Sequence, residues 1–310
     1  LQQYIDLYRE HHEVIDRHSS AVLNALRPEA LQAIERNGLP TTRHEDYHHT
    51  DLEAMFAPDF GLNITRIELP SQPHEAFRCD VPNLSTSLYF VLNDLFYDKA
   101  LPKATLPEGV IISSLGKACE EFPEVVKRCY GQLARSGKDA INALNTMLAQ
   151  DGLFIYVPRG LVVDRTIQVI NILRSDVDLM VNRRVLIVLE EGAQARILVC
   201  DHALDDRNFL ATQVSEVFVG ENAHLELYEL EETHVKCHRM SNMYVQMQAN
   251  STAVLDNITL QNGQTRNRTD VQLAGEGAEV HMNGCVIADQ KQHVDNNTLI
   301  DHAAPHCQSH

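Results

Sequence analysis

The chain has 310 residues, of which 44% are hydrophobic and 22% charged, a composition typical of a folded soluble protein with one large domain or two smaller ones. Its net charge of −17 argues against binding to nucleic acid, which depends on neutralising phosphates with Lys and Arg, and against attachment to an anionic membrane. The longest apolar runs, such as the one at 185–189, are too short to cross a bilayer, and no signal-peptide pattern opens the chain.

The beginning of the chain is expected to be helical. Apolar residues recur at steps of three and four through 1–37, which is the spacing of one helix face. Pro28 is expected in the first turn of a second helix, where its missing N–H costs nothing, and Gly38 followed by Pro40 is a helix stop. The segment 40–52 is polar, rich in histidine and without a clear period, which indicates a connector.

The middle of the chain mixes broken and periodic segments. It is rich in proline up to residue 110, and its apolar runs at 88–96 and 110–115 predict two strands. Helical spacing returns at 117–150, and Gly152 ends the last of these helices. We therefore treat residues 1–152 as an N-terminal helical and mixed region.

A β domain is expected over 153–310, because β-branched and aromatic residues dominate there and no helical pattern appears before residue 300. One phrase recurs in it: a turn residue, a small residue, a polar residue, and then an apolar residue that opens a strand. The turn residues are Gly192, Asn222, Asn250 and Gly277, spaced by 30, 28 and 27 residues, with Gly160 in a looser earlier copy.

This repeat is typical of a stacked solenoid, since each rung has an apolar face that it buries only against its neighbours. Gly and Asn at the corners permit a positive φ. A propeller would need longer repeats with sharper hairpins, so we expect a mainly β fold with a parallel β-helix. Along 224–232 we expect Leu225, Leu227 and Leu230 to point inward, and the carboxylates of Glu226, Glu229, Glu231 and Glu232 to point outward.

Four histidines and a cysteine crowd residues 293–310, and imidazole and thiolate are good ligands for zinc or iron. The candidate metal ligands are His302, His306 and Cys307. Two histidines four residues apart share one face of a strand but lie roughly 13 Å apart along it, which is too far to bind one ion. Pro305 disfavours a helix that would bring them together, although a turn around it would do so. We favour a structural or interface role for this segment over a metal site.

Two smaller clusters are interpreted in the same way. The histidine-rich segment 44–49 is a candidate metal binder, but we favour a polar, solvated connector between helix and sheet. Cys237 and His238 are neighbours in a β region, so their side chains point to opposite faces and the pair is expected to be structural.

The cysteines are seven in number, scattered and never in a Cys-x-x-Cys pair. This argues against a zinc ribbon, a ferredoxin-like cluster site, a thioredoxin-like pair and a secreted disulfide scaffold. We expect a cytoplasmic protein in which most cysteines are buried as small hydrophobic residues. Their positions are 79, 119, 129, 200, 237, 285 and 307.

No catalytic residue is expected. The chain lacks the phosphate-binding loop of ATPases and the Gly-x-Ser-x-Gly motif of hydrolases. Two alternative functions stay open on the residues alone. One is a lyase-like, carbohydrate-active β-helix enzyme that uses outward carboxylates, and the other is a histidine-rich metal-binding module.

Three phrases resemble, in order and spacing, motifs of the SufB/SufD family of iron–sulfur cluster assembly scaffolds. They are PTTRHEDYHHTDL at 40–52, LNTMLAQDGLFIYVPRG at 144–160 and HVDNNTLIDHAAPHCQS at 293–309. The first resembles the SufD branch of the family more than the SufB branch. The residues that carry the first and third matches are Arg43, Glu45, Asp46, Thr50, Asp295, His302, Pro305, Cys307 and Ser309.

The resemblance implies a right-handed parallel β-helix that lacks the family's C-terminal helical part. It implies a non-catalytic, SufD-like scaffold subunit of a SufBCD-type complex that assembles and transfers iron–sulfur clusters. The implied partners are a SufB-like paralogue and a SufC-like ATPase, with a homodimer through the β-helix as a further arrangement. No cofactor would be bound stably by this chain alone, and the cluster would form in the assembled complex. Because the chain ends inside the third phrase, we expect further rungs and the cluster-related residues beyond residue 310.

Overall fold

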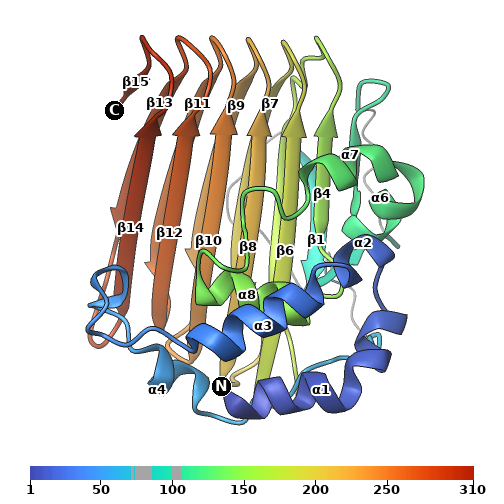
Figure 1. The fold of residues 1–310 in the computed structure, drawn as a ribbon, viewed down its shortest axis with the longest axis vertical. Helices are drawn as coiled ribbons and strands as arrows, with labels where there is room; N and C mark the ends of the chain where they lie inside the picture. The colour runs from blue at the N-terminus through green and yellow to red at the C-terminus, as the bar shows by residue number, and fades with distance from the viewer. Residues whose placement is uncertain (71–72, 74–85, 100–105) are drawn as a thin grey trace.

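The structure is a computed structural model that describes residues 1–70, 73, 86–99 and 106–310. Among these residues, seven strands form one sheet, which we name sheet A, and eight form a second, which we name sheet B. Successive strands of the second half alternate between the two sheets, so the chain winds as a β-solenoid, and helices from the first half cover one side of it (Figure 1). The expected mainly β solenoid behind an N-terminal helical region is confirmed.

Sheet A extends from the N-terminal end of the solenoid to its C-terminal end. Its strands pair in parallel, except that β3 is antiparallel to β4. In spatial order they are β3 (Ile111–Ser114), β4 (Leu153–Val157), β6 (Leu179–Leu189), β8 (Phe209–Val219), β10 (Cys237–Met247), β12 (Gln264–Leu273) and β14 (His293–His302).

Sheet B lies opposite sheet A. In both sheets, apart from the edge strand β2, strands that come later in the sequence lie nearer the C-terminal end of the solenoid. It is parallel except for the hairpin partner β2, which is antiparallel to β1. In spatial order its strands are β2 (Leu95–Tyr97), β1 (Thr86–Leu92), β5 (Thr166–Leu173), β7 (Gln194–Ala203), β9 (His224–Glu232), β11 (Thr252–Gln261), β13 (Glu279–Val286) and β15 (Gln308–Ser309).

The apolar half of the solenoid interior is built from aligned β-branched residues. Ile155, Ile187, Val217, Val245 and Val271 occupy the same level of five neighbouring strands of sheet A. All five are at least 98% buried in one cluster that also takes side chains from sheet B. Identical levels on successive strands explain why a sequence repeat of about one rung is visible at all.

Each corner between a sheet A strand and the following sheet B strand has one residue in the left-handed region. The corner residues are Gly160, Gly192, Asn222, Asn250, Gly277 and His306, with φ between 54° and 72°. The N–H of each of the first five donates to the carbonyl of the residue that precedes the next corner, at 2.8–3.2 Å. The four predicted anchors are confirmed, and His306 continues the same series.

The N-terminal helices form a layer on the outer face of sheet A (Figure 1). Pro28 lies in the first turn of its helix and Gly38, with φ 64°, ends it, as predicted. None of the described helices is both long and apolar enough to span a membrane. The described helical elements are α1 (Gln2–Arg17), α2 (Ala21–Asn24), α3 (Arg27–Asn37), η1 (Glu45–Tyr47), α4 (Leu52–Phe56), α6 (Leu115–Glu121), α7 (Pro123–Cys129) and α8 (Ala140–Leu148).

Helix α8 is the element that joins the two layers. It packs against β6, β8 and β10 on one side and against α3 on the other, so nearly every one of its side chains is buried. Its polar residues are paired with the sheet: Asn145 Nδ2 donates to the Arg183 carbonyl at 2.9 Å and to the Thr212 hydroxyl at 3.0 Å. The helical layer is therefore fixed to the solenoid.

Two details differ from the expectations. The run at 88–96 is not one strand but the hairpin of β1 and β2, because Asn93 turns the chain with φ 57°. Strand β1 then pairs with β5 from Thr86 to Leu92, so the first half of the chain supplies part of sheet B. The division at 152/153 and the right-handed sense of the coil stay predictions.

Candidate functional site

The segment that follows α3 lies against β12. The Arg266 guanidinium stacks over the Tyr47 ring at 3.9 Å, and its Nη2 donates to the Asp46 carbonyl at 2.7 Å. Arg268 reaches the same segment, with Nη1 donating to Asp46 Oδ2 at 3.0 Å. Two arginines on alternate positions of one strand thus hold the turn η1 to sheet A.

Arg266 also lies close to a residue of β14. Thr50 Oγ1 donates to Asp295 Oδ2 at 2.6 Å, and Arg266 Nε lies 3.7 Å from that oxygen. The two motifs at 40–52 and 293–309 therefore meet in one cluster. We name it the motif junction and define it as Asp46, Thr50, Arg266, Arg268 and Asp295.

A buried network continues the motif junction toward α8. Tyr47 Oη donates to Asp139 Oδ2 at 2.7 Å, and Asn242 Nδ2 donates to the other oxygen at 2.9 Å. Burial, with the neighbouring Asp139 carboxylate, raises the pKa of Tyr47 well above its ordinary value, so the phenol stays a proton donor. A surface cavity of about 460 Å³ opens beside this network and is lined in part by His44 and Lys138.

Two further residues of the first motif point to solvent. Arg43 and Glu45 are exposed and lie outside the motif junction. Residues 44–48 also have the spacing His-Glu-x-x-His, which in zinc peptidases lies on an α-helix, and our sequence reasoning overlooked it. Here the segment is the short 3-10 turn η1, with His44 Nδ1 accepting from the Thr41 N–H at 3.0 Å. The two histidines do not share a helix face.

The structure separates the three predicted metal ligands of the C-terminal motif. His302 Nε2 is 2.9 Å from Ser309 Oγ, the exposed His306 ring is 3.8 Å from Glu276, and Cys307 Sγ donates to the Gly275 carbonyl at 3.3 Å. No group of three potential ligands within 4.8 Å, among residues the structure describes, contains any of them. The structural or interface role expected for this segment stays a prediction.

The last motif instead forms a corner of the solenoid. Pro305 offers its carbonyl to the Gly277 N–H at 3.2 Å, and His306 takes the left-handed corner conformation. Cys307 follows the corner and packs against the apolar interior. It occupies the rung position that Ala193, Ala223, Ser251 and Ala278 hold in earlier copies.

Most of the other described cysteines are at least partly buried, as packing residues are. Cys129, Cys200 and Cys237 are buried, Cys119 is half-buried and Cys285 is exposed, while position 79 lies outside the described residues. Burial raises the pKa of Cys237 to about 11, which keeps it a thiol. Its neighbour His238 turns to the opposite face and accepts from the Gln264 N–H at 3.2 Å, as the alternation of a strand predicts.

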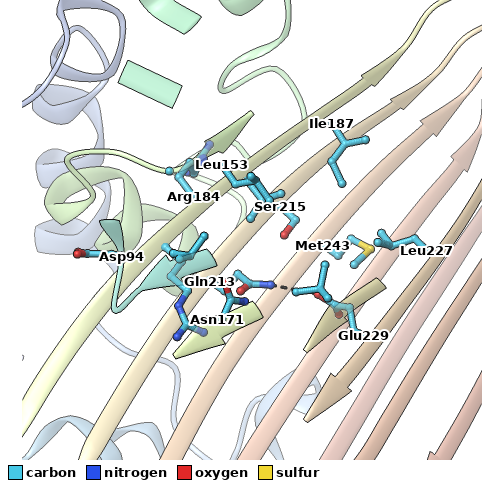
Figure 2. A pocket seen from close by; sticks show the side chains of 15 residues that line it. Asp94, Leu153, Asn171, Arg184, Ile187, Gln213, Ser215, Leu227, Glu229 and Met243 are labelled. Carbon is cyan, nitrogen blue, oxygen red and sulfur yellow. Dashed lines mark hydrogen bonds between the residues drawn. The ribbon is translucent and has the colours of Figure 1, made fainter. Parts of the chain in front are cut away.

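A second polar cluster lies inside the solenoid, between the sheets. Arg183 Nη1 donates to Asp201 Oδ1 at 2.7 Å, and Arg239 donates to the other oxygen of Asp201 and, at 3.3 Å, to Glu229. Gln213 points toward Glu229 and donates to it at 3.1 Å (Figure 2). Burial alone would raise the pKa of Asp201, but the Arg239 and Arg183 guanidiniums outweigh it and hold that pKa below its ordinary value.

Sequence reasoning missed this interior cluster at β9. Leu225 and Leu227 point inward as predicted, but Glu229 and Glu231 do too, while Leu230 lies on the other face. The prediction that these two carboxylates point outward was wrong because strict alternation continues to the end of the strand. Because Glu229 and Glu231 point inward, they cannot serve as the outward carboxylates of a carbohydrate-active site.

The interior glutamates are weak acids in this setting. Burial raises the pKa of Glu229, and it raises that of Glu231 to about 7, although the Thr265 hydroxyl donates to Glu231 at 2.8 Å. A cavity of about 20 Å³ lies beside Arg183 and Glu229, enough for one water. A larger cavity of about 230 Å³ continues from Glu229 toward Asn267 and Asn296.

Two family models together match nearly the whole chain. The model described as "SufBD protein N-terminal region" matches residues 1–169, and the model described as "SUF system FeS cluster assembly, SufBD core domain" matches residues 171–310. The chain belongs to the SufB/SufD family. Its resemblance to SufD is supported by a curated relative.

That relative is the iron–sulfur cluster assembly protein SufD of Escherichia coli, 25% identical over 282 residues, which are 90% of this chain and 63% of the relative. A SufBD family protein of Trieres chinensis is 31% identical over 122 residues, 38% of this chain and 24% of that protein. One of Staphylococcus saprophyticus is 23% identical over 203 residues, 65% of this chain and 43% of that protein. The SufBD chain described here thus spans less than two thirds of the length of these relatives.

Proposed function

We propose that this protein is a non-catalytic, SufD-like scaffold subunit of a SufBCD-type complex that assembles iron–sulfur clusters and transfers them. The observation that carries the proposal is the succession of two SufBD family matches over residues 1–169 and 171–310. The match to the E. coli protein named SufD, over 90% of this chain, favours the SufD branch.

The proposed mechanism is geometric. The stacked rungs give a stiff body, and the motif junction and α8 tie the helical layer to that body at separate places. A stiff body of this kind transmits the movement of one bound partner to another. The partners are a SufB-like paralogue, bound through the solenoid, and a SufC-like ATPase, whose ATP-driven motion would pass through the pair. A homodimer through the solenoid is the alternative assembly.

The cluster is cargo of the assembled complex in this proposal, and this chain alone binds no cluster stably. Three of the described cysteines are buried and scattered, which does not suit a shared set of thiolate ligands. The cytoplasm, where thiols stay reduced, is the proposed location.

The proposal is tested by anaerobic reconstitution with ferrous iron and sulfide, followed by visible absorption. The full-length gene product is treated alone, and then together with the SufB-like and SufC-like proteins of the same source. We expect strong cluster absorption for the three proteins together and little for this protein alone. Equal absorption with and without the partners would contradict the scaffold role.

A parallel assay addresses the non-catalytic part of the proposal. The purified protein is incubated with ATP and, separately, with polyuronates as substrates of β-helix lyases. No turnover is expected in either case. Cleavage of a polyuronate that survives repeated purification would favour the carbohydrate-active alternative instead.

A further inference from the structure

Two residues of β13 and one beyond β15 bring potential metal ligands together on the outer face of sheet B. Glu279 and His281 are two residues apart and flank the fully buried Val280, so both side chains point outward. The neighbouring chain continues the ladder, with the His310 N–H donating to the Val280 carbonyl at 2.9 Å and the Met282 N–H to the His310 carbonyl at 2.8 Å. This pairing sets His310 beside His281.

The side chains converge on one carboxylate oxygen. His281 Nε2 lies 2.7 Å and His310 Nε2 3.7 Å from Glu279 Oε1, and the two imidazole rings are stacked with centroids 4.6 Å apart. One ligand atom from each of the three residues lies within 4.8 Å of the others. Bonds of about 2.0–2.2 Å to a common ion need ligand atoms about 3.3 Å apart in tetrahedral geometry, so small side-chain rotations suffice.

The charge around Glu279 distinguishes it from the similar pair on β9. There, His224 Nε2 lies 3.4 Å from Glu226, but Arg196 Nε already binds that carboxylate at 2.6 Å and the Tyr228 hydroxyl donates to it at 2.8 Å. Within the described part of the chain, no lysine or arginine pairs with Glu279, whose ionic partners are the two histidines.

Two imidazole nitrogens and one carboxylate oxygen suit borderline first-row metals and not the hard ions Mg²⁺ and Ca²⁺, which prefer oxygen ligands. We propose that Glu279, His281 and His310 form a surface site for a divalent transition metal ion of the Zn²⁺ or Fe²⁺ class. Three protein ligands leave a coordination position open, so the bound ion is exchangeable and accessible to an incoming ligand.

The test is a titration of the purified protein with Co²⁺, whose visible absorption reports nitrogen and oxygen coordination, with Zn²⁺ as competitor. We expect one ion per chain, displaced by Zn²⁺ and unaffected by excess Mg²⁺. His281→Ala, His310→Ala and Glu279→Gln should each weaken Co²⁺ binding about tenfold or more. His224→Ala is the matched control, since it removes a histidine from the same face of the same sheet.

Circular dichroism of each variant confirms that the exposed substitutions leave the fold intact. Absence of Co²⁺ binding, unchanged binding in His281→Ala and His310→Ala, or equal loss in His224→Ala would overturn the proposal. The site does not depend on the proposed scaffold function. A protein that assembles with its partners but binds no Co²⁺ would contradict only the metal site.

Discussion

The Thr50 hydroxyl donates a 2.6 Å hydrogen bond to the Asp295 carboxylate across a sequence separation of 245 residues. It joins the connector after α3 to β14, the outermost described strand of sheet A. Arg266, between them, also approaches Asp295. The two motifs that most resemble the SufB/SufD family are therefore two halves of one contact, which holds the helical layer on a late rung of the solenoid.

This contact is expected to stabilise the protein measurably. Thr50→Val keeps the shape of the buried side chain but removes the donor to a charged acceptor, so the free energy of unfolding should fall by about 1.5–3 kcal/mol. Urea unfolding followed by circular dichroism measures the change. Thr42→Val, in the exposed part of the same segment, is the control and should stay within about 0.5 kcal/mol. Equal effects of both would show that the hydrogen bond contributes nothing.

The interior carboxyl of Glu231 makes stability depend on pH. Its folded-state pKa of about 7 lies above the ordinary value of 4.5, so between these values the folded state holds a proton that the unfolded state has lost. This group's contribution is therefore most favourable below pH 4.5 and declines as pH rises to about 7, by about 3 kcal/mol in total.

Glu231→Gln should remove this decline, so that the variant gains stability relative to the wild type between pH 5 and pH 8. Chemical unfolding at several pH values measures the difference. Glu221→Gln, at an exposed corner, should leave the pH profile of the wild type unchanged. A parallel pH profile for Glu231→Gln and the wild type would show that the side chain is solvated in solution.

His306 is expected to act through its backbone. With φ 58° it occupies a conformation that costs a residue with a Cβ about 1–2 kcal/mol. His306→Gly should therefore keep or raise the free energy of unfolding, and His306→Val should lower it by about 1–2 kcal/mol. Neither substitution should change Co²⁺ binding. Loss of Co²⁺ binding in His306→Gly would show that the imidazole ring of His306 contributes to the metal site, contrary to the backbone role assigned to it here.

The interior arginine of β10 is expected to be essential for stability. Arg239→Leu leaves Asp201 and Glu229 without their shared partner between the sheets, and the free energy of unfolding should fall by about 3–5 kcal/mol. The control Arg159→Leu removes an arginine that is 76% exposed and pairs with Glu191 at the surface. That variant should lose no more than about 1 kcal/mol. A similar loss in both variants would indicate that the interior ion pairs are not formed.

The solenoid could be predicted because its rules are local and repeat. Gly192, Asn222, Asn250 and Gly277 each satisfy a corner that needs a positive φ, and one corner is visible without knowledge of the others. The last corner, at His306, escaped detection, because a histidine rarely takes that conformation and Cys307 replaces the usual small residue after it. The helix boundaries followed from Pro28 and Gly38 in the same local way.

The sites could not be predicted because they depend on contacts between distant segments. In the sequence, Arg266 and Arg268 cannot be distinguished from ordinary polar residues of a strand. Only the fold shows that the turn η1 packs against them. Glu229 was assigned to the surface by its charge, although the alternation of its own strand already indicated the interior. The convergence of Glu279, His281 and His310 requires the register between two strands, which the spacing of one histidine to the next does not reveal.

The most direct test of the scaffold role is native mass spectrometry of the tagged full-length gene product, co-expressed with the SufB-like and SufC-like proteins of its source. The account predicts a single assembly that contains all three proteins. It would be contradicted if this protein were recovered alone or only as a homodimer while the other two proteins assembled with each other.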